Sequence, residues 1–158
     1  MIRNGLSAKL FLGLTVIAFS AGWPGVRSMA DTSAAQQVLE VVRRFQSAGI
    51  RGDGIELNRI FDPQITHFHP GSPYRLVGRD RLVREFETAA KSQRDMRFEM
   101  IDPQVQMADG NVAVVTYYIV ESWAAENNVR NSANEKATEV YVKRNGSWVM
   151  IHGHYSSQ

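Results

Sequence analysis

Residues 136–156, KATEVYVKRNGSWVMIHGHYS, predict two β-strands joined at Asn145-Gly146. Asn-Gly is the strongest short signal for a hairpin turn, because both turn positions require a positive φ. Successive side chains of a strand point to opposite faces, so each arm can be sorted by parity. One face of the first arm carries Ala137, Glu139, Tyr141 and Lys143. One face of the second arm carries Trp148, Met150, His152 and His154. Since the hairpin must bury at least one face, we expect a carboxylate, aromatic rings and imidazoles close to the core.

The residues before this hairpin predict more antiparallel strands. Residues 97–107 are strand-like but are interrupted by Asp102-Pro103, which indicates a bulge or an edge position. Asp109-Gly110 predicts the next hairpin turn. The longest β-rich run is 111–123, and one of its faces carries Tyr117, Ile119, Glu121 and Trp123. Residues 124–134 are polar and rich in Asn, so we expect a loop there.

The N-terminal half predicts three helices instead. The first runs from near Ala34 to Gly49, with an apolar stripe at Val38, Val41, Val42 and Phe45. A short second helix follows residues 52–54, and a third spans about Asp80 to Ser92. Residues 65–69 predict a short strand with His67 and His69 on one face, and residues 74–77 a small return strand. The fold class is therefore α+β: three N-terminal helices pack on a strongly curved, mainly antiparallel sheet. Such a cone has an opening suited to a ligand.

Residues 1–30 have the layout of a secretory signal peptide. Arg3 and Lys9 precede a twelve-residue, mostly apolar run from Leu10 to Ala21, and small residues surround Ala30. That run is short of the roughly 20 residues needed to span a bilayer. We expect cleavage after Ala30, export to the periplasm or the medium, and no stable membrane insertion of the domain at 31–158.

Charge and cysteine content narrow the function classes. The chain has 18 basic and 16 acidic residues. Three of the basic residues and none of the acidic residues lie in residues 1–30. Residues 31–158 therefore contain 15 basic and 16 acidic residues, a formal net charge of −1. This balance argues against nucleic acid as a partner. The chain has no cysteine, so its fold needs no disulfide, and no motif for a cofactor is present.

Three further stretches carry a family resemblance: residues 101–105 (IDPQV), 143–148 (KRNGSW) and 151–156 (IHGHYS). In register with the strand pattern, they resemble the nuclear transport factor 2-like (cystatin-like) superfamily over about residues 34–156. Within it the chain looks most like the SnoaL-like proteins and the association (hub) domain of calcium/calmodulin-dependent protein kinase II. The superfamily contains isomerases and cyclases as well as non-catalytic binding and assembly domains.

The resemblance also suggests site residues. The general base of the ketosteroid isomerases falls at His69, and their protonated, hydrogen-bond-donating acid falls at Glu139. Their oxyanion-hole tyrosine falls at Phe45, which cannot donate a hydrogen bond. The two arginines of the hub-domain cleft fall at Ile119 and Glu139, so that anion-binding character is absent. His69 and Glu139 are therefore the candidate catalytic pair. The residues expected to line the pocket around them are Phe45, His67, Tyr117, Ile119, Glu121, Trp123, Tyr141, His152 and His154.

Two functions follow from these observations. The first is an exported binding or assembly domain whose pocket holds a small apolar or aromatic ligand. The second is a cofactor-independent acid–base enzyme of isomerase, cyclase or hydratase type that uses His69 and Glu139. The pairs His67/His69 and His152/His154 each have i, i+2 spacing, which on a strand places both imidazoles on one face. Each pair could bind one metal ion, or each ring could form hydrogen bonds of its own. We predict no metal site.

An outer apolar stripe predicts self-association. Its members are Val112, Val114, Thr138, Val140 and Val142. Three helices are too few to cover this stripe as well as the pocket face, so we expect a homodimer through it.

Overall fold

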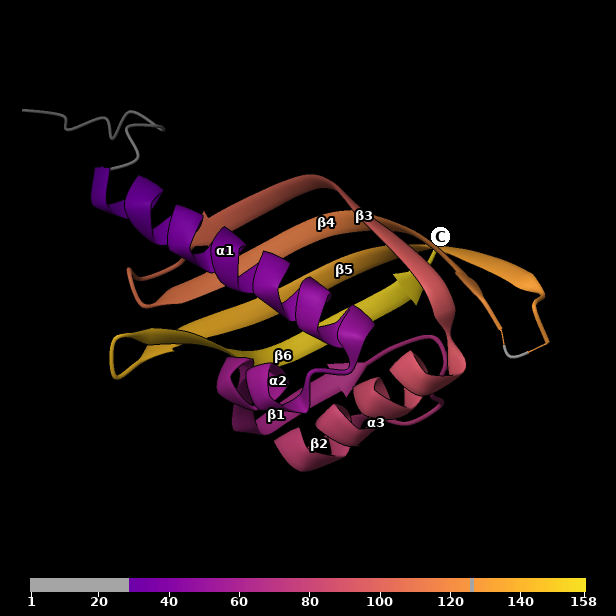
Figure 1. Cartoon of the computed structure of the whole chain (residues 1–158). Helices are drawn as coiled ribbons and strands as arrows, with labels where there is room; N and C mark the ends of the chain where they lie inside the picture. The colour runs from indigo at the N-terminus through magenta and orange to yellow at the C-terminus, as the bar shows by residue number, and fades with distance from the viewer. Residues whose placement is uncertain (1–28, 126) are drawn as a thin grey trace, which may run out of the picture.

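The structure is a computed structural model that describes residues 29–125 and 127–158. The proposed leader, except for Met29 and Ala30, lies outside the described residues. Three helices lie on one side of a single curved sheet, as Figure 1 shows. This confirms the α+β fold class predicted from the order of elements. No helix in the described part of the chain is long and apolar enough to cross a membrane.

The helices form where apolar residues recur at helical spacing. Helix α1 spans Met29–Arg51 and buries Val38, Val42 and Phe45 against the sheet. It begins earlier than the predicted Ala34. Helix α2 covers Gly54–Ile60, and the Asp53 carboxylate caps it by accepting a hydrogen bond from the Glu56 backbone N–H at 3.1 Å. Helix α3 covers Arg79–Ser92.

Six strands form one sheet in the order β2-β1-β6-β5-β4-β3. All neighbouring pairs are antiparallel except β1 and β6, which are parallel. The strands are β1 Phe61–Phe68, β2 Leu76–Val77, β3 Arg94–Met107, β4 Val112–Ala124, β5 Arg130–Arg144 and β6 Ser147–Ser157. The hairpin turn at Asn145-Gly146 is confirmed, with φ of 51° and 81° at its two residues. β3 is an edge strand, and its pairing with β4 shifts between Ile101 and Gln104, as Asp102-Pro103 predicted.

Two sequence predictions about the closing strands are wrong. β5 begins at Arg130, so the loop expected over 124–134 is only five residues long and the strand reaches further toward the cavity mouth. The second error concerns β6. The β5–β6 register shifts between Val140 and Tyr141, which pair with His152 and Met150 and leave Ile151 as an extra residue. This bulge reverses parity after Ile151.

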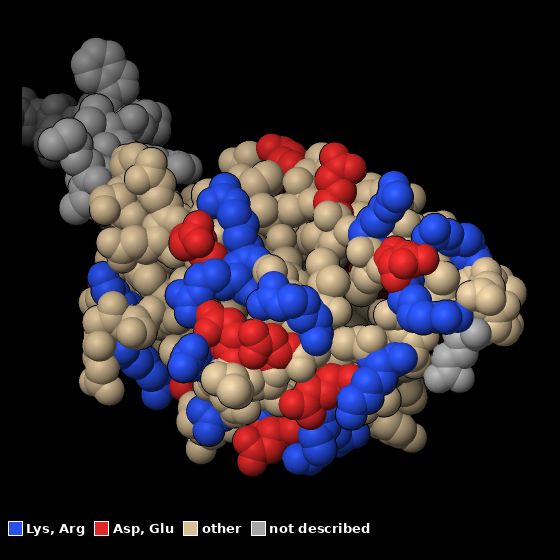
Figure 2. Space-filling model, viewed as in Figure 1, with Lys and Arg blue, Asp and Glu red and all other residues tan. Residues whose placement is uncertain are grey.

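The core lies between the helices and the concave face of the sheet. Tyr141, Met150 and Trp148 from the closing hairpin are buried there beside Phe61 and Ile60. Over the helical side of the molecule, acidic and basic side chains are interspersed, as Figure 2 shows. Among the described residues, no helix covers the outer face of the sheet in Figure 1, and apolar side chains such as Ile101, Tyr118 and Val120 are exposed.

Candidate functional site

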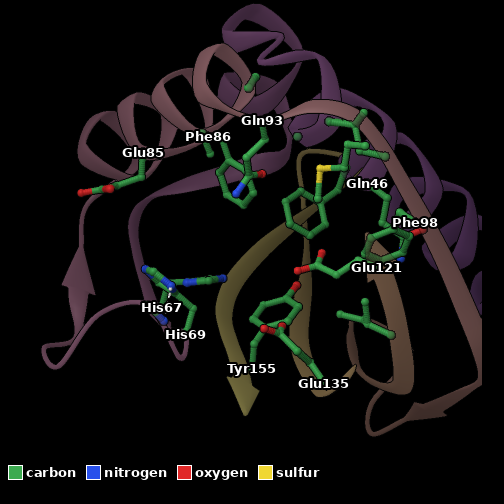
Figure 3. Close-up of a pocket in the computed structure, with 18 of the residues that line it drawn as sticks. Gln46, His67, His69, Glu85, Phe86, Gln93, Phe98, Glu121, Glu135 and Tyr155 are labelled. Atoms are coloured by element: carbon green, nitrogen blue, oxygen red, sulfur yellow. Dashed lines mark hydrogen bonds between the residues drawn. The ribbon is translucent and has the colours of Figure 1, made fainter. Parts of the chain in front are cut away.

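A cavity of about 390 Å³ opens between α1, α3 and the concave face of the sheet. This volume is in the range of small-molecule sites. Apolar side chains form most of its wall, with Phe45 from α1, Phe86 from α3, and Phe98 from β3. Phe45 and Phe86 meet edge-on with ring centroids 5.5 Å apart. Figure 3 shows Phe86 of α3 and Gln93, the residue directly after α3, extending into this space above the sheet.

Glu139 lies beneath the cavity floor, fully buried. Its Oε1 accepts hydrogen bonds from the hydroxyls of Tyr117, at 2.6 Å, and of Tyr155. Its Oε2 accepts a third from the Tyr141 hydroxyl at 2.7 Å. Burial raises the pKa of Glu139, and the three hydrogen bonds oppose that rise. Tyr117 and Tyr155 also line the cavity, so their rings separate Glu139 from it.

His67 lines the cavity but has no partner for either ring nitrogen. Its side chain belongs to β1, and only 4% of the residue is exposed. It stacks against Tyr155, with ring centroids 4.9 Å apart. Burial, with the neighbouring imidazole of His69 as a smaller cause, lowers the pKa of His67 to about 3. His67 is therefore a neutral imidazole whose two ring nitrogens, one a donor and one an acceptor, are buried in the cavity wall without a hydrogen-bond partner.

Two carboxylates stand at the sheet side of the cavity. Glu121 of β4 and Glu135 of β5 belong to neighbouring strands, where Glu121 pairs with Ala133 and Glu135 with Ile119. Both are half-buried. Burial, together with the charge of Glu135, raises the pKa of Glu121 to about 7, and burial also raises the pKa of Glu135.

The structure brings together seven of the residues named from the sequence. These cavity-lining residues are Phe45, His67, His69, Tyr117, Ile119, Glu121 and Trp123. Glu139 and Tyr141 do not line the cavity but lie under it. The placement of His152 and His154 in the pocket is wrong, because the bulge at Ile151 turns both to the outer face. There His152 Nδ1 lies 2.8 Å from the Thr66 hydroxyl, and Phe68 packs against both rings.

The predicted acid–base pair is not assembled. His69 lies at the rim, with its Nδ1 accepting a hydrogen bond from the Gly71 backbone N–H at 3.2 Å. Glu139 is enclosed by the three tyrosine hydroxyls beneath the floor. In the described residues no group of three or more His, Asp or Glu side chains is arranged to hold a metal ion.

Sequence reasoning missed Tyr155 and Glu135 as site residues. Tyr155 was assigned to the wrong face because parity was counted through the bulge. Glu135 falls between the loop predicted over 124–134 and the strand predicted from 136, although continuing the alternation of Ala137 and Glu139 backwards along the chain puts it on the cavity face.

A bent sheet with three helices over a deep pocket defines a nuclear transport factor 2-like domain. A protein of this superfamily from Salmonella enterica superposes with a TM-score of 0.73 at 19% identity, over 80% of this chain and 92% of that one. The sequence profile of the family "Calcium/calmodulin dependent protein kinase II association domain" matches residues 34–158. The chain therefore belongs to this family and is an association domain within the superfamily.

Two relatives define the likeness more closely. The delta subunit of calcium/calmodulin-dependent protein kinase type II from Oryctolagus cuniculus is 26% identical over 123 residues, which are 77% of this chain. Those residues span only 23% of the length of that kinase subunit. The CaMKII hub of S. rosetta superposes with a TM-score of 0.67 at 28% identity, over 78% of this chain and 96% of the hub.

Proposed function

We propose that this association domain joins copies of its own chain through the outer face of the sheet. One observation carries the proposal: exposed apolar side chains continue from strand to strand across that face. Ile101 of β3 pairs with Tyr118 of β4, and they are 40% and 46% exposed. Val120 of β4 is 42% exposed. A contiguous apolar surface of this kind is typical of an interface.

The remaining members of the face extend this patch into β5. Val114 pairs with Val140, and Val112 pairs with Val142, and all four are half-buried. A second copy of the same face would cover these side chains symmetrically, as in other two-fold dimers. The name "hub" of the S. rosetta relative fits an assembly role.

Light scattering tests the assembly directly. At micromolar concentration we expect the wild-type mass to be that of a dimer or a larger assembly. Val114→Lys with Val140→Lys places two ammonium groups on the patch, so the double variant should be a monomer with a native circular dichroism spectrum. Ile55→Lys is the matched control, because Ile55 is 72% exposed on α2, away from this face. A monomeric wild type would refute the proposal.

We infer further that the cavity binds a small apolar or aromatic ligand. Support comes from its volume, its aromatic wall, and the two free ring nitrogens of His67, because a buried polar group without a partner is unfavourable. Turnover by His69 and Glu139 is the weaker candidate, since only His69 lines the space.

The export of the domain is also a proposal, and it rests on the composition of residues 1–30 alone. Expressed in a bacterial host, the exported protein should begin at Asp31. Intact-mass measurement of protein from the periplasmic fraction checks this expectation. Protein that keeps the Leu10–Ala21 run in its purified form would contradict it.

A further inference from the structure

The cavity combines an apolar wall with two carboxyl groups that have no basic residue beside them in that wall. Glu121 and Glu135 both line it, and in Figure 3 their carboxyl groups turn toward the same space. No Lys or Arg occurs among the described residues that form its lining. Glu85 of α3 is a third carboxylate at the rim, but its side chain is turned away from the space in Figure 3. Glu121 and Glu135 therefore face the cavity without a basic partner in its wall.

A second, independent feature of the cavity points to a ligand. His67 is buried, faces the space from β1, and leaves both ring nitrogens without a hydrogen-bond partner. In Figure 3 it lies across the space from Glu121. Because the cavity wall between these two groups is aromatic, the site offers a hydrogen-bonding group at one end, rings in the middle and anions at the other end.

We propose that the cavity binds a small aromatic amine, with its ammonium group held by Glu121 and Glu135. The aromatic ring of the ligand lies among Phe45, Phe86 and Phe98, and a hydroxyl on that ring reaches His67. This inference names the ligand class for the ligand-binding function proposed above, and rests on it. Trp123, which also lines the cavity, adds an aromatic face next to the ammonium position.

The energetics of Glu121 favour a cation at this place. An unfolded glutamate loses its proton near pH 4.5, whereas the raised pKa of Glu121 is about 7. Between these two pH values Glu121 is still largely protonated in the folded protein but has lost its proton in the unfolded chain. The contribution of Glu121 to the free energy of unfolding therefore falls as pH rises. An ammonium group beside the carboxylate supplies the missing positive charge and removes this penalty.

Other ligand classes fit less well. An anion would face two carboxylates, and a bare metal ion would find two carboxylate side chains in a cavity far larger than its coordination sphere. A neutral aromatic molecule would occupy the rings but leave Glu121 and Glu135 unpaired. A protonated aromatic amine satisfies both parts of the wall.

Calorimetric titration of the purified protein with four probes tests the proposal at pH 8. Tyramine carries the ring, the hydroxyl and the ammonium group. 4-Ethylphenol lacks the charge, 3-(4-hydroxyphenyl)propionate reverses it, and phenethylamine lacks the hydroxyl. We expect tyramine to bind at least about tenfold more tightly than 4-ethylphenol, because a charge-assisted hydrogen bond in a partly buried site contributes at this level. The propionate should show no binding, and phenethylamine should bind about fivefold more weakly than tyramine.

Variants link the effect to the two carboxylates. Glu121→Gln with Glu135→Gln keeps the shape of the wall and should weaken tyramine about tenfold or more, while 4-ethylphenol affinity stays the same. Glu40→Gln is the control, since the Glu40 side chain on α1 is 65% exposed and does not line the cavity. Its tyramine affinity should equal that of the wild type.

The pH dependence gives an independent readout. The other titratable groups that line the cavity with Glu121 are Glu135 of β5, Glu85 of α3, His67 of β1, His69 just after β1, Tyr117 of β4 and Tyr155 of β6, while α1 contributes the neutral Gln46. With a Glu121 pKa of about 7 and an amine that stays protonated, tyramine affinity should rise about tenfold from pH 6 to pH 8. The double Gln variant should lose this rise.

The outcomes separate the two proposals. Equal binding of tyramine and 4-ethylphenol overturns the amine inference but leaves a ligand-binding cavity. Tyramine binding that is unchanged in the double Gln variant also overturns it. If none of the four probes binds, the amine inference and the ligand-binding function both fail, whereas the assembly function, measured by light scattering, is unaffected.

Discussion

Replacing Glu139 by Ala is expected to lower the free energy of unfolding by about 3–5 kcal/mol. The substitution removes a fully buried side chain and leaves the hydroxyls of Tyr117, Tyr141 and Tyr155 without their acceptor. Each buried donor left unsatisfied costs about 1–3 kcal/mol, and the vacated volume adds to this. Because whole domains are stable by only about 5–15 kcal/mol, the effect is large. Urea unfolding followed by circular dichroism measures it.

Glu135→Ala is the matched control on the same strand. Glu135 is half-buried, and its removal also relieves repulsion with Glu121. The free energy of unfolding of the Glu135→Ala variant should therefore stay within about 0.5 kcal/mol of the wild-type value or exceed it. A loss below 1 kcal/mol in Glu139→Ala would show that the tyrosine hydroxyls find other acceptors, and would disprove the central role of this carboxylate.

Glu139 should also make stability depend on pH, with a defined sign. Burial raises its pKa in the folded state above the value near 4.5 of an unfolded glutamate. The stabilising contribution of the protonated form is thus complete at acidic pH and is lost as pH rises toward the folded-state pKa. Glu139→Gln cannot ionise, so the stability difference between wild type and this variant should shift in favour of the variant as pH increases from 4.5 upward.

Trp148→Ala is expected to cost about 3–5 kcal/mol of unfolding free energy, the usual range for a large buried aromatic residue. Trp148 is 5% exposed, and its Nε1 donates a hydrogen bond to Gln37 Oε1 at 3.4 Å. The side chain thus joins the closing hairpin to α1 at the far end of the chain. Thermal and urea denaturation both report the loss.

Tyr74→Ala provides the comparison for this substitution. Tyr74 is also aromatic but is 74% exposed, so its truncation should change stability by no more than about 0.5 kcal/mol. If the two alanine variants melted at similar temperatures, Trp148 would not be a core residue in solution.

Much of the fold was predictable from local patterns. The Asn145-Gly146 turn, the interruption at Asp102-Pro103 and the apolar stripe of α1 each act over a few residues, and each prediction is confirmed. The family resemblance is confirmed as well, by the match over residues 34–158. Part of the cavity followed from parity on β4, because 112–124 has no bulge in its pairing with β5.

The errors about which face the β6 side chains occupy have one physical cause. A β-bulge adds a single residue to one strand, and every side chain beyond it changes face. Ile151 has no feature in the sequence that marks it as that extra residue. For this reason His152 and His154 were predicted in the pocket, while Tyr155 was missed.

The order of elements, the main turns, and the residues that share a face where strands are regular all follow from the amino-acid sequence. These depend on backbone preferences and on spacing within one segment, which are local properties. Two further relations appear only in the folded molecule: three tyrosine hydroxyls surround Glu139, and Glu121 and Glu135 line the cavity together with His67. Those relations join β1, β4, β5 and β6, and depend on register between strands. The register between β5 and β6 depends on the packing of the whole sheet. The bulge at Ile151 turns the side chains that follow it on β6 to the opposite face, and this arrangement is stable only where the core has room for those that now point inward.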